Sequence, residues 1–231
     1  MKAKIQFGSK EIDFHWEYSN RKSLGITVTP DLDILVKAPA DASLSKIKEK
    51  VTKKAPWIIK QQSFFLSFHP KTPARKFISG ETHLYLGRQY RLKIITGKDE
   101  SVKLKGKYIE VTTTDKSNVR QLVNKWYLQN AKLKFHTVAQ QLIEKFKKHK
   151  AQPSSIVLRE MPTRWGSCTP KGKLILNPEL IKAPKGCIEY VIIHELCHLV
   201  HRDHTQRFID LQTKEMRDWE KWKMRLEKMM A

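Results

Sequence analysis

Cysteine is scarce in this chain, and long apolar runs are missing. The three cysteines, Cys168, Cys187 and Cys197, are odd in number and form no C-x-x-C pair. We therefore expect no disulfide framework and predict a reduced, cytoplasmic setting. The N-terminus lacks the apolar core of a secretory signal, and no apolar run reaches the roughly 20 residues of a membrane-spanning helix. The sequence predicts a soluble protein without a membrane span.

Acidic residues are also few, with 23 Asp and Glu against 45 Lys and Arg, which gives a net charge of +22. A charge of this size predicts attraction to polyanions, such as nucleic acid or nucleotides, through a basic surface. The alternative interpretation is an ordinary solvated lysine surface. No P-loop or Rossmann fingerprint is present to indicate nucleotide binding by a separate route.

The apolar pattern predicts an α+β protein whose character changes near residue 115. Before that point, alternating apolar residues predict short strands. Apolar residues at helical spacing predict one inserted helix from about Leu44 to Phe68, kinked or divided at Pro56. Beyond it we expect a long helix, Val119 to about Lys148, and a terminal amphipathic helix, Phe208 to about Met230. We see no internal repeat. The predicted division is a β-rich N-terminal lobe over residues 1–115 and a second lobe over residues 116–231.

One stretch of the second lobe carries a chemical signature, His194-Glu195-Leu196-Cys197-His198. On a helix, positions four apart are separated by about 1.1 turns, so both imidazoles leave one face and can share a zinc ion. Glu195 lies about 100° further round the helix and would border the open position of the metal. A general base for a metal-bound water belongs there. The alternative is a core helix that carries two histidines by chance.

A catalytic zinc needs a third protein ligand, and the residues after the helix offer several candidates. If the helix continued, His201 would lie about 10 Å along its axis from His194, too far for the two rings to converge easily. His204 could converge if the helix ends near Arg202 and the chain turns back. We predict His204 as the third ligand, with His201 or Glu215 as alternatives.

The segment from Arg164 to Cys168 precedes a predicted strand that begins at Leu174. A sheet edge beside a metal-binding helix is a natural place for an extended peptide to add as a strand, and Gly166 would permit close backbone approach. Arg164 and Ser167 could bind substrate oxygens. Tyr190, Arg164 and His201 are candidates to stabilise an oxyanion.

These motifs together resemble the YgjP-like metallopeptidase family, also called domain of unknown function 45 and related to the SprT-like zinc peptidases. The resemblance implies a zincin-like α+β catalytic part, with zinc at the positions of His194, His198 and His204 and with Glu195 as the base. Its main motifs are Arg164-Trp165-Gly166-Ser167-Cys168, Leu176-Asn177-Pro178, Tyr190 to Leu199, and Asp203-His204-Thr205. Upstream matches extend it over nearly the whole chain: Ala38-Pro39, Ala55-Pro56-Trp57-Ile58, Gly80-Glu81, Tyr85-Leu86-Gly87-Arg88 and Trp126-Tyr127.

We therefore predict a zinc-dependent hydrolase that cleaves a peptide or protein substrate through a zinc-activated water. One alternative is a metal-dependent nucleotide phosphohydrolase, because phosphate-ester hydrolysis also uses a metal-activated water. Another is a nucleic-acid-binding protein with a structural zinc. A structural site usually has four protein ligands, often including cysteine, and Cys197 lies about 100° from the direction of His198 on the helix.

Overall fold

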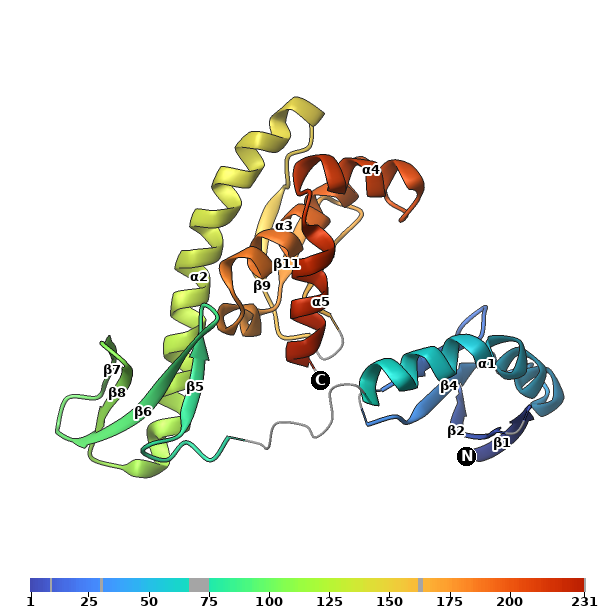
Figure 1. Ribbon diagram of the computed structural model, residues 1–231, viewed down its shortest axis with the longest axis horizontal. Coiled ribbons are helices and arrows are strands. Elements are labelled where there is room, and N and C mark those ends of the chain that lie inside the picture. The colour runs from blue at the N-terminus through green and yellow to red at the C-terminus, as the bar shows by residue number, and fades with distance from the viewer. Residues whose placement is uncertain (9, 30, 67–74, 162–163, 231) are drawn as a thin grey trace. The chain divides into compact units, whose positions relative to one another are not determined.

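The computed structural model describes residues 1–8, 10–29, 31–66, 75–161 and 164–230. It forms two compact units, Met1–Pro73 and Ala74–Met229 (Figure 1), each with its own hydrophobic core. The division predicted at residue 115 falls inside the second unit. Strand residues Ile109 and Val111 share one core with Val119 and Val123 of the helix that follows them, so the chain does not separate there.

The first unit is a four-stranded sheet with one helix, and its strands lie in the order β1-β2-β4-β3. The helix buries a stripe of residues at helical spacing, Ile47, Val51, Ala55 and Ile58. It passes through Pro56 without dividing, because that residue is exposed and water can satisfy the freed carbonyl group. The predicted end at Phe68 lies outside the described residues. The elements are β1 (Lys2–Phe7), β2 (Lys10–Tyr18), β3 (Gly25–Val28), β4 (Ile34–Ala38) and α1 (Leu44–Leu66).

The second unit opens with the same topology as the first. Its strands lie in the order β5-β6-β8-β7, and in both sheets the outer pairs are antiparallel while the central pair is parallel. A helix follows the last strand of each sheet. The chain thus repeats a ββββα module that its sequence does not show. The elements are β5 (Thr82–Tyr85), β6 (Arg88–Thr96), β7 (Ser101–Lys105), β8 (Tyr108–Thr113) and α2 (Val119–Phe146).

Helix α2 is the longest element and confirms the predicted long helix. The carboxylate of Asp115 accepts a hydrogen bond from the backbone N–H of Ser117 at 2.8 Å and so caps the turn from which α2 grows. In Figure 1 the β5–β8 sheet lies at the N-terminal half of α2, and α4 lies near its C-terminal end. The helix buries one stripe along its length: Val119, Val123, Tyr127, Ala131, Phe135, Val138, Ala139, Leu142 and Phe146.

A three-stranded sheet and three helices complete the second unit. The sheet order is β10-β11-β9, so β10 is an edge strand, and α3 packs against both β10 and α2. Among the described residues, no helix is long and apolar enough to cross a membrane. The elements are β9 (Ser155–Leu158), β10 (Gly166–Cys168), β11 (Lys173–Leu176), α3 (Lys185–Val200), α4 (Gln206–Glu215) and α5 (Trp219–Met230).

The prediction of one terminal helix from Phe208 to Met230 is wrong, because the chain breaks after Glu215 into α4 and α5. The break allows two tryptophans to pack against α3. Trp219 stacks on Tyr190 with ring centroids 6.3 Å apart, and Trp222 covers Gly186, where any Cβ would lie 2.4 Å from the indole. Packing on α3 therefore overrides the uninterrupted helical pattern.

Candidate metal centre

Three histidines converge at the end of α3. His194 and His198 lie on one face of the helix, with ring centroids 4.9 Å apart. The helix ends at Val200, His201 is extended with φ −129°, and the chain turns back so that His204 precedes α4. The Nε2 atoms of His204 and His194 are 3.1 Å apart, and one ring nitrogen from each of the three histidines lies within 4.8 Å of the others.

Two side chains of helix α4 contact this histidine cluster. Phe208 is fully buried, and its ring centroid lies 4.7–5.1 Å from those of all three histidines. Gln212 is also buried, and its Oε1 accepts a hydrogen bond from Nδ1 of His194 at 2.7 Å. Nδ1 of His198 lies 3.3 Å from the carbonyl oxygen of His201. These contacts occupy the Nδ1 atoms of His194 and His198 and leave Nε2 of each free to bind a metal.

The alternative third ligands lie elsewhere. His201 contributes its backbone carbonyl to the cluster and is not one of the converging imidazoles. Glu215 is buried in ion pairs at the end of α2, 3.0 Å from Nζ of Lys148 and 2.9 Å from Nε2 of His149. These two groups hold the pKa of Glu215 below its ordinary value despite its burial. In the described part of the chain, the metal-ligand geometry therefore belongs to His194, His198 and His204.

Burial sets the electrostatics of the site. Removal from water lowers the pKa of His194 to about 4, so its ring is neutral and has a lone pair available at neutral pH. Glu195 is only 5% exposed, and burial raises the pKa of its carboxyl to about 7. The charge of Arg164 and a hydrogen bond from the backbone N–H of Cys168 oppose that rise. A carboxyl group poised near neutrality can both accept and return a proton.

Glu195 is wedged between α3 and β10, and Gly166 makes this close approach possible. A Cβ at Gly166 would lie 2.6 Å from Oε1 of Glu195 and 2.8 Å from Cγ1 of Val191. The sequence suggested that Gly166 admits a substrate backbone. The structure shows that its missing side chain makes room for Glu195.

Replacing Gly166 with alanine should therefore force β10 and α3 apart. We expect the free energy of unfolding to fall by about 1–3 kcal/mol, the usual range for overpacking. Urea denaturation of the two proteins measures the difference. Equal stability would contradict the close contact between Gly166 and Glu195.

The raised pKa of Glu195 predicts a pH-dependent stability of the metal-free protein. Well below pH 4.5, the ordinary pKa, the carboxyl is protonated in both the folded and the unfolded protein, so its titration does not change the free energy of unfolding. As the pH rises toward 7, the unfolded chain loses this proton first, so stability is lost. The loss is on the order of 3 kcal/mol when complete.

Glu195→Gln removes this titration and leaves the histidines unchanged. Chelator-treated wild type should lose more stability than the variant between pH 5 and pH 8 in urea denaturation. The same pH dependence in both proteins would contradict the assignment to Glu195.

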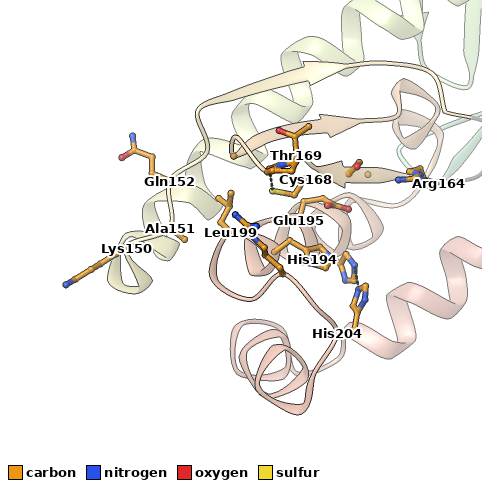
Figure 2. Close-up of a pocket in the computed structure, with 16 residues that line it drawn as sticks. Lys150, Ala151, Gln152, Arg164, Cys168, Thr169, His194, Glu195, Leu199 and His204 are labelled. Atoms are coloured by element: carbon orange, nitrogen blue, oxygen red, sulfur yellow. Dashed lines mark hydrogen bonds between the residues drawn. The ribbon is translucent and has the colours of Figure 1, made fainter. Parts of the chain in front are cut away.

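The site opens into a cavity of about 670 Å³. Of the predicted substrate-binding residues, Arg164, Gly166 and Ser167 line it. Figure 2 shows Glu195 beside His194, with Arg164 at one end of the cavity and Lys150 and Gln152 at the other. The cavity thus joins the histidine cluster to the edge strand β10.

Tyr190 and His201, the other two predicted substrate-binding residues, are not among the residues that line the cavity. Tyr190 is buried, with its ring centroid 5.9 Å from that of His194, and burial raises the pKa of its hydroxyl. The ring therefore packs behind a histidine of the cluster. His201 contributes its carbonyl group to the contact with His198.

Sequence reasoning missed two supporting residues, Gln212 and Asn177. Asn177 is buried and donates hydrogen bonds from Nδ2 to the carbonyl oxygens of Met161 at 2.9 Å and Arg164 at 3.3 Å. Its backbone N–H donates to the carbonyl of Trp165. Asn177 thereby fixes the backbone that carries Arg164 and Gly166. Its position before Pro178, a typical helix-capping signal, was the available clue.

Three converging imidazoles beside a buried carboxylate form the kind of centre used by metal-dependent hydrolases. Residues 22–229 match the family model of the YgjP-like metallopeptidase domain. The chain therefore belongs to the YgjP-like metallopeptidase family, which confirms the resemblance of its motifs and is consistent with the α+β fold. No curated protein and no solved structure matches the chain.

Proposed function

We propose that this protein is a zinc-dependent metallopeptidase in which His194, His198 and His204 hold the metal and Glu195 is the general base. The observation that carries the proposal is the convergence of three imidazole nitrogens within 4.8 Å beside a buried carboxylate. Neutral imidazoles suit zinc, and three protein ligands leave a position open for water. The hydrogen bond from His194 to Gln212 is the outer contact that such a ligand requires.

A dication at this centre would acidify a water molecule and polarise the scissile carbonyl. Glu195 takes the proton from the attacking water and passes it to the leaving amine. The backbone N–H of Cys168 orients the carboxylate of Glu195, and the burial of Glu195 excludes competing solvent. Hydrolysis then proceeds with one residue serving first as base and then as acid.

The edge strand β10 is the natural place for the substrate. In the described ranges, β10 pairs only with β11. On its other edge the Cys168 N–H bonds Glu195, and the remaining backbone groups of that edge can pair with an extended peptide. Gly166 and Ser167 of this strand line the cavity, and Arg164 lies beside it. We propose that a peptide or protein segment pairs with β10 and thereby brings its scissile bond to Glu195.

A second candidate function keeps the same centre and changes the substrate. Lys150, Arg164 and Arg202 line the cavity, and Glu195 is the only acidic side chain among the described residues that line it. Cations around a metal centre also suit a nucleotide phosphate. Parallel assays of peptides and nucleoside triphosphates with wild type and Glu195→Gln decide between them, because the true reaction must be lost in the variant.

A closed structural zinc is less consistent with the site. Cys197 is buried in the core and does not belong to the group of converging ligand atoms, which His194, His198 and His204 supply. All three cysteines are free, which fits the cytoplasmic setting that we propose.

Gln212→Leu tests the support of the metal ligands. Losing the acceptor for Nδ1 of His194 should weaken metal affinity by about 10–100-fold, measured by competition with a chromophoric chelator. Gln206→Leu is the matched control, because Gln206 lies on the same helix, is exposed and bonds Asp210 at 2.8 Å. Equal affinities of Gln212→Leu and wild type would show that Gln212 does not position the ligand.

A further inference from the structure

The first unit contains a second cavity, of about 610 Å³, between α1 and the edge strand β3. One wall is a single stripe of α1 that ends in Trp57, a tryptophan with 42% of its surface exposed. The opposite wall is apolar, with Leu24 before the strand and Ile26 within it. We call this cavity the α1–β3 groove. Its helical wall consists of Lys46, Glu49, Lys50, Lys53, Lys54 and Trp57.

The α1–β3 groove is strongly basic. Among the described residues that line it, Glu49 alone is acidic, and this residue is paired with Lys53 at 2.8 Å. Lys46, Lys50 and Lys54 have no ion-pair partner among the described residues. These three lysines recur four residues apart, so their ammonium groups line the same side of the helix over two turns. The groove thus presents a row of lysines, which outnumber its acidic residue, opposite an apolar wall.

The groove also runs beside an open sheet edge. Within the described part of the first unit, β3 pairs only with β4. Val28 is buried in the core beneath α1, and Ile26 and Leu24, two and four residues earlier, point to the same face because side chains alternate along a strand. A strand added to this edge would place every second side chain on that face, beside Leu24 and Ile26 and toward the lysines of α1.

We propose that the α1–β3 groove binds an extended peptide that adds as a strand to β3 and whose every second side chain, the set that faces the groove, is acidic or aliphatic in turn. Backbone hydrogen bonds along β3 would supply affinity. The apolar wall and Trp57 would contact the aliphatic side chains, and the lysines of α1 would pair with the carboxylates. The open backbone edge favours a peptide over nucleic acid, which has no means of continuing a β-ladder. The groove belongs to the first unit and the metal centre to the second.

The direct test is fluorescence anisotropy of a labelled peptide with the repeat Glu-Thr-Val-Thr, whose Glu and Val side chains share one face of a strand. The full chain carries Glu195→Gln so that no cleavage occurs. We expect saturable binding that weakens steeply at high salt. Lys50→Glu combined with Lys54→Glu should weaken it by about tenfold or more, and Trp57→Ala by roughly tenfold. Lys60→Glu is the matched control, since Lys60 is exposed on the same helix outside the groove.

Strand addition can be tested more specifically, because only alternate residues of an added strand direct their backbone N–H groups toward β3. Peptides N-methylated at one set of alternate positions should lose binding, whereas those methylated at the other set should keep it. Equal binding of the two sets would overturn strand addition. No binding of the peptide, or binding of single-stranded DNA alone with the same dependence on Lys50 and Lys54, would overturn the proposed occupant. Circular dichroism establishes that each variant is folded.

Discussion

Replacing Glu195 with glutamine is expected to abolish hydrolysis while the metal stays bound. Glutamine keeps the size of the side chain but cannot accept a proton, so the attacking water retains its proton. We expect the rate to fall by about 10²–10⁴-fold or more, the usual contribution of a general base. The measurement is a turnover assay on protein whose metal content is determined in the same sample.

Glu189→Gln is the matched control for this variant. Glu189 lies on the same helix and forms an ion pair with Lys185 at 3.2 Å, outside the cavity. It makes the same chemical change without touching the histidines, and activity should remain. Full activity of a metal-loaded Glu195→Gln protein would refute the proposed base.

His204→Ala is expected to lose most of its metal and all activity. Two ligands on one helix cannot enclose the ion, so affinity should fall by more than the roughly 10–100-fold that outer contacts contribute. Competition with a chelator measures this loss. Loss of metal in this variant would distinguish the three-histidine site from any arrangement in which the third ligand is another residue.

The control is His201→Ala, three residues away. In the structure His201 contributes its carbonyl group, which alanine retains, so metal binding should be nearly unchanged. The reverse result, with metal lost in His201→Ala and kept in His204→Ala, would assign the third ligand to His201.

The elements of the candidate metal centre could be predicted because local rules place them. Helical spacing puts His194 and His198 on one face, and the end of α3 at Val200 turns the chain so that His204 can return. The roles of Gln212 and Asn177 could not be predicted, because their partners lie on distant elements. Nothing in the local sequence around Gln212 shows that it faces His194.

The fold shows the same contrast. The strands and the long helix follow from alternating and helical apolar patterns, but hydropathy alone does not show which residues a helix buries, because Leu128 of α2 is 40% exposed. The stripe runs instead through small and aromatic residues such as Tyr127 and Ala131, which hydropathy alone ranks below leucine. The repeated ββββα module was invisible because a topology requires only alternating patterns and turns, not similar residues.

Zinc K-edge X-ray absorption of the purified protein tests the central claim most directly, because it identifies both the metal and its ligands. The account predicts zinc with a shell of nitrogen and oxygen at about 2.0–2.1 Å, the scattering pattern of three imidazoles, and one further oxygen from water. A sulfur shell near 2.3 Å, or four protein ligands without water, would mean a structural zinc and contradict a catalytic centre. A zinc-loaded protein without the imidazole pattern would contradict the assignment of His194, His198 and His204.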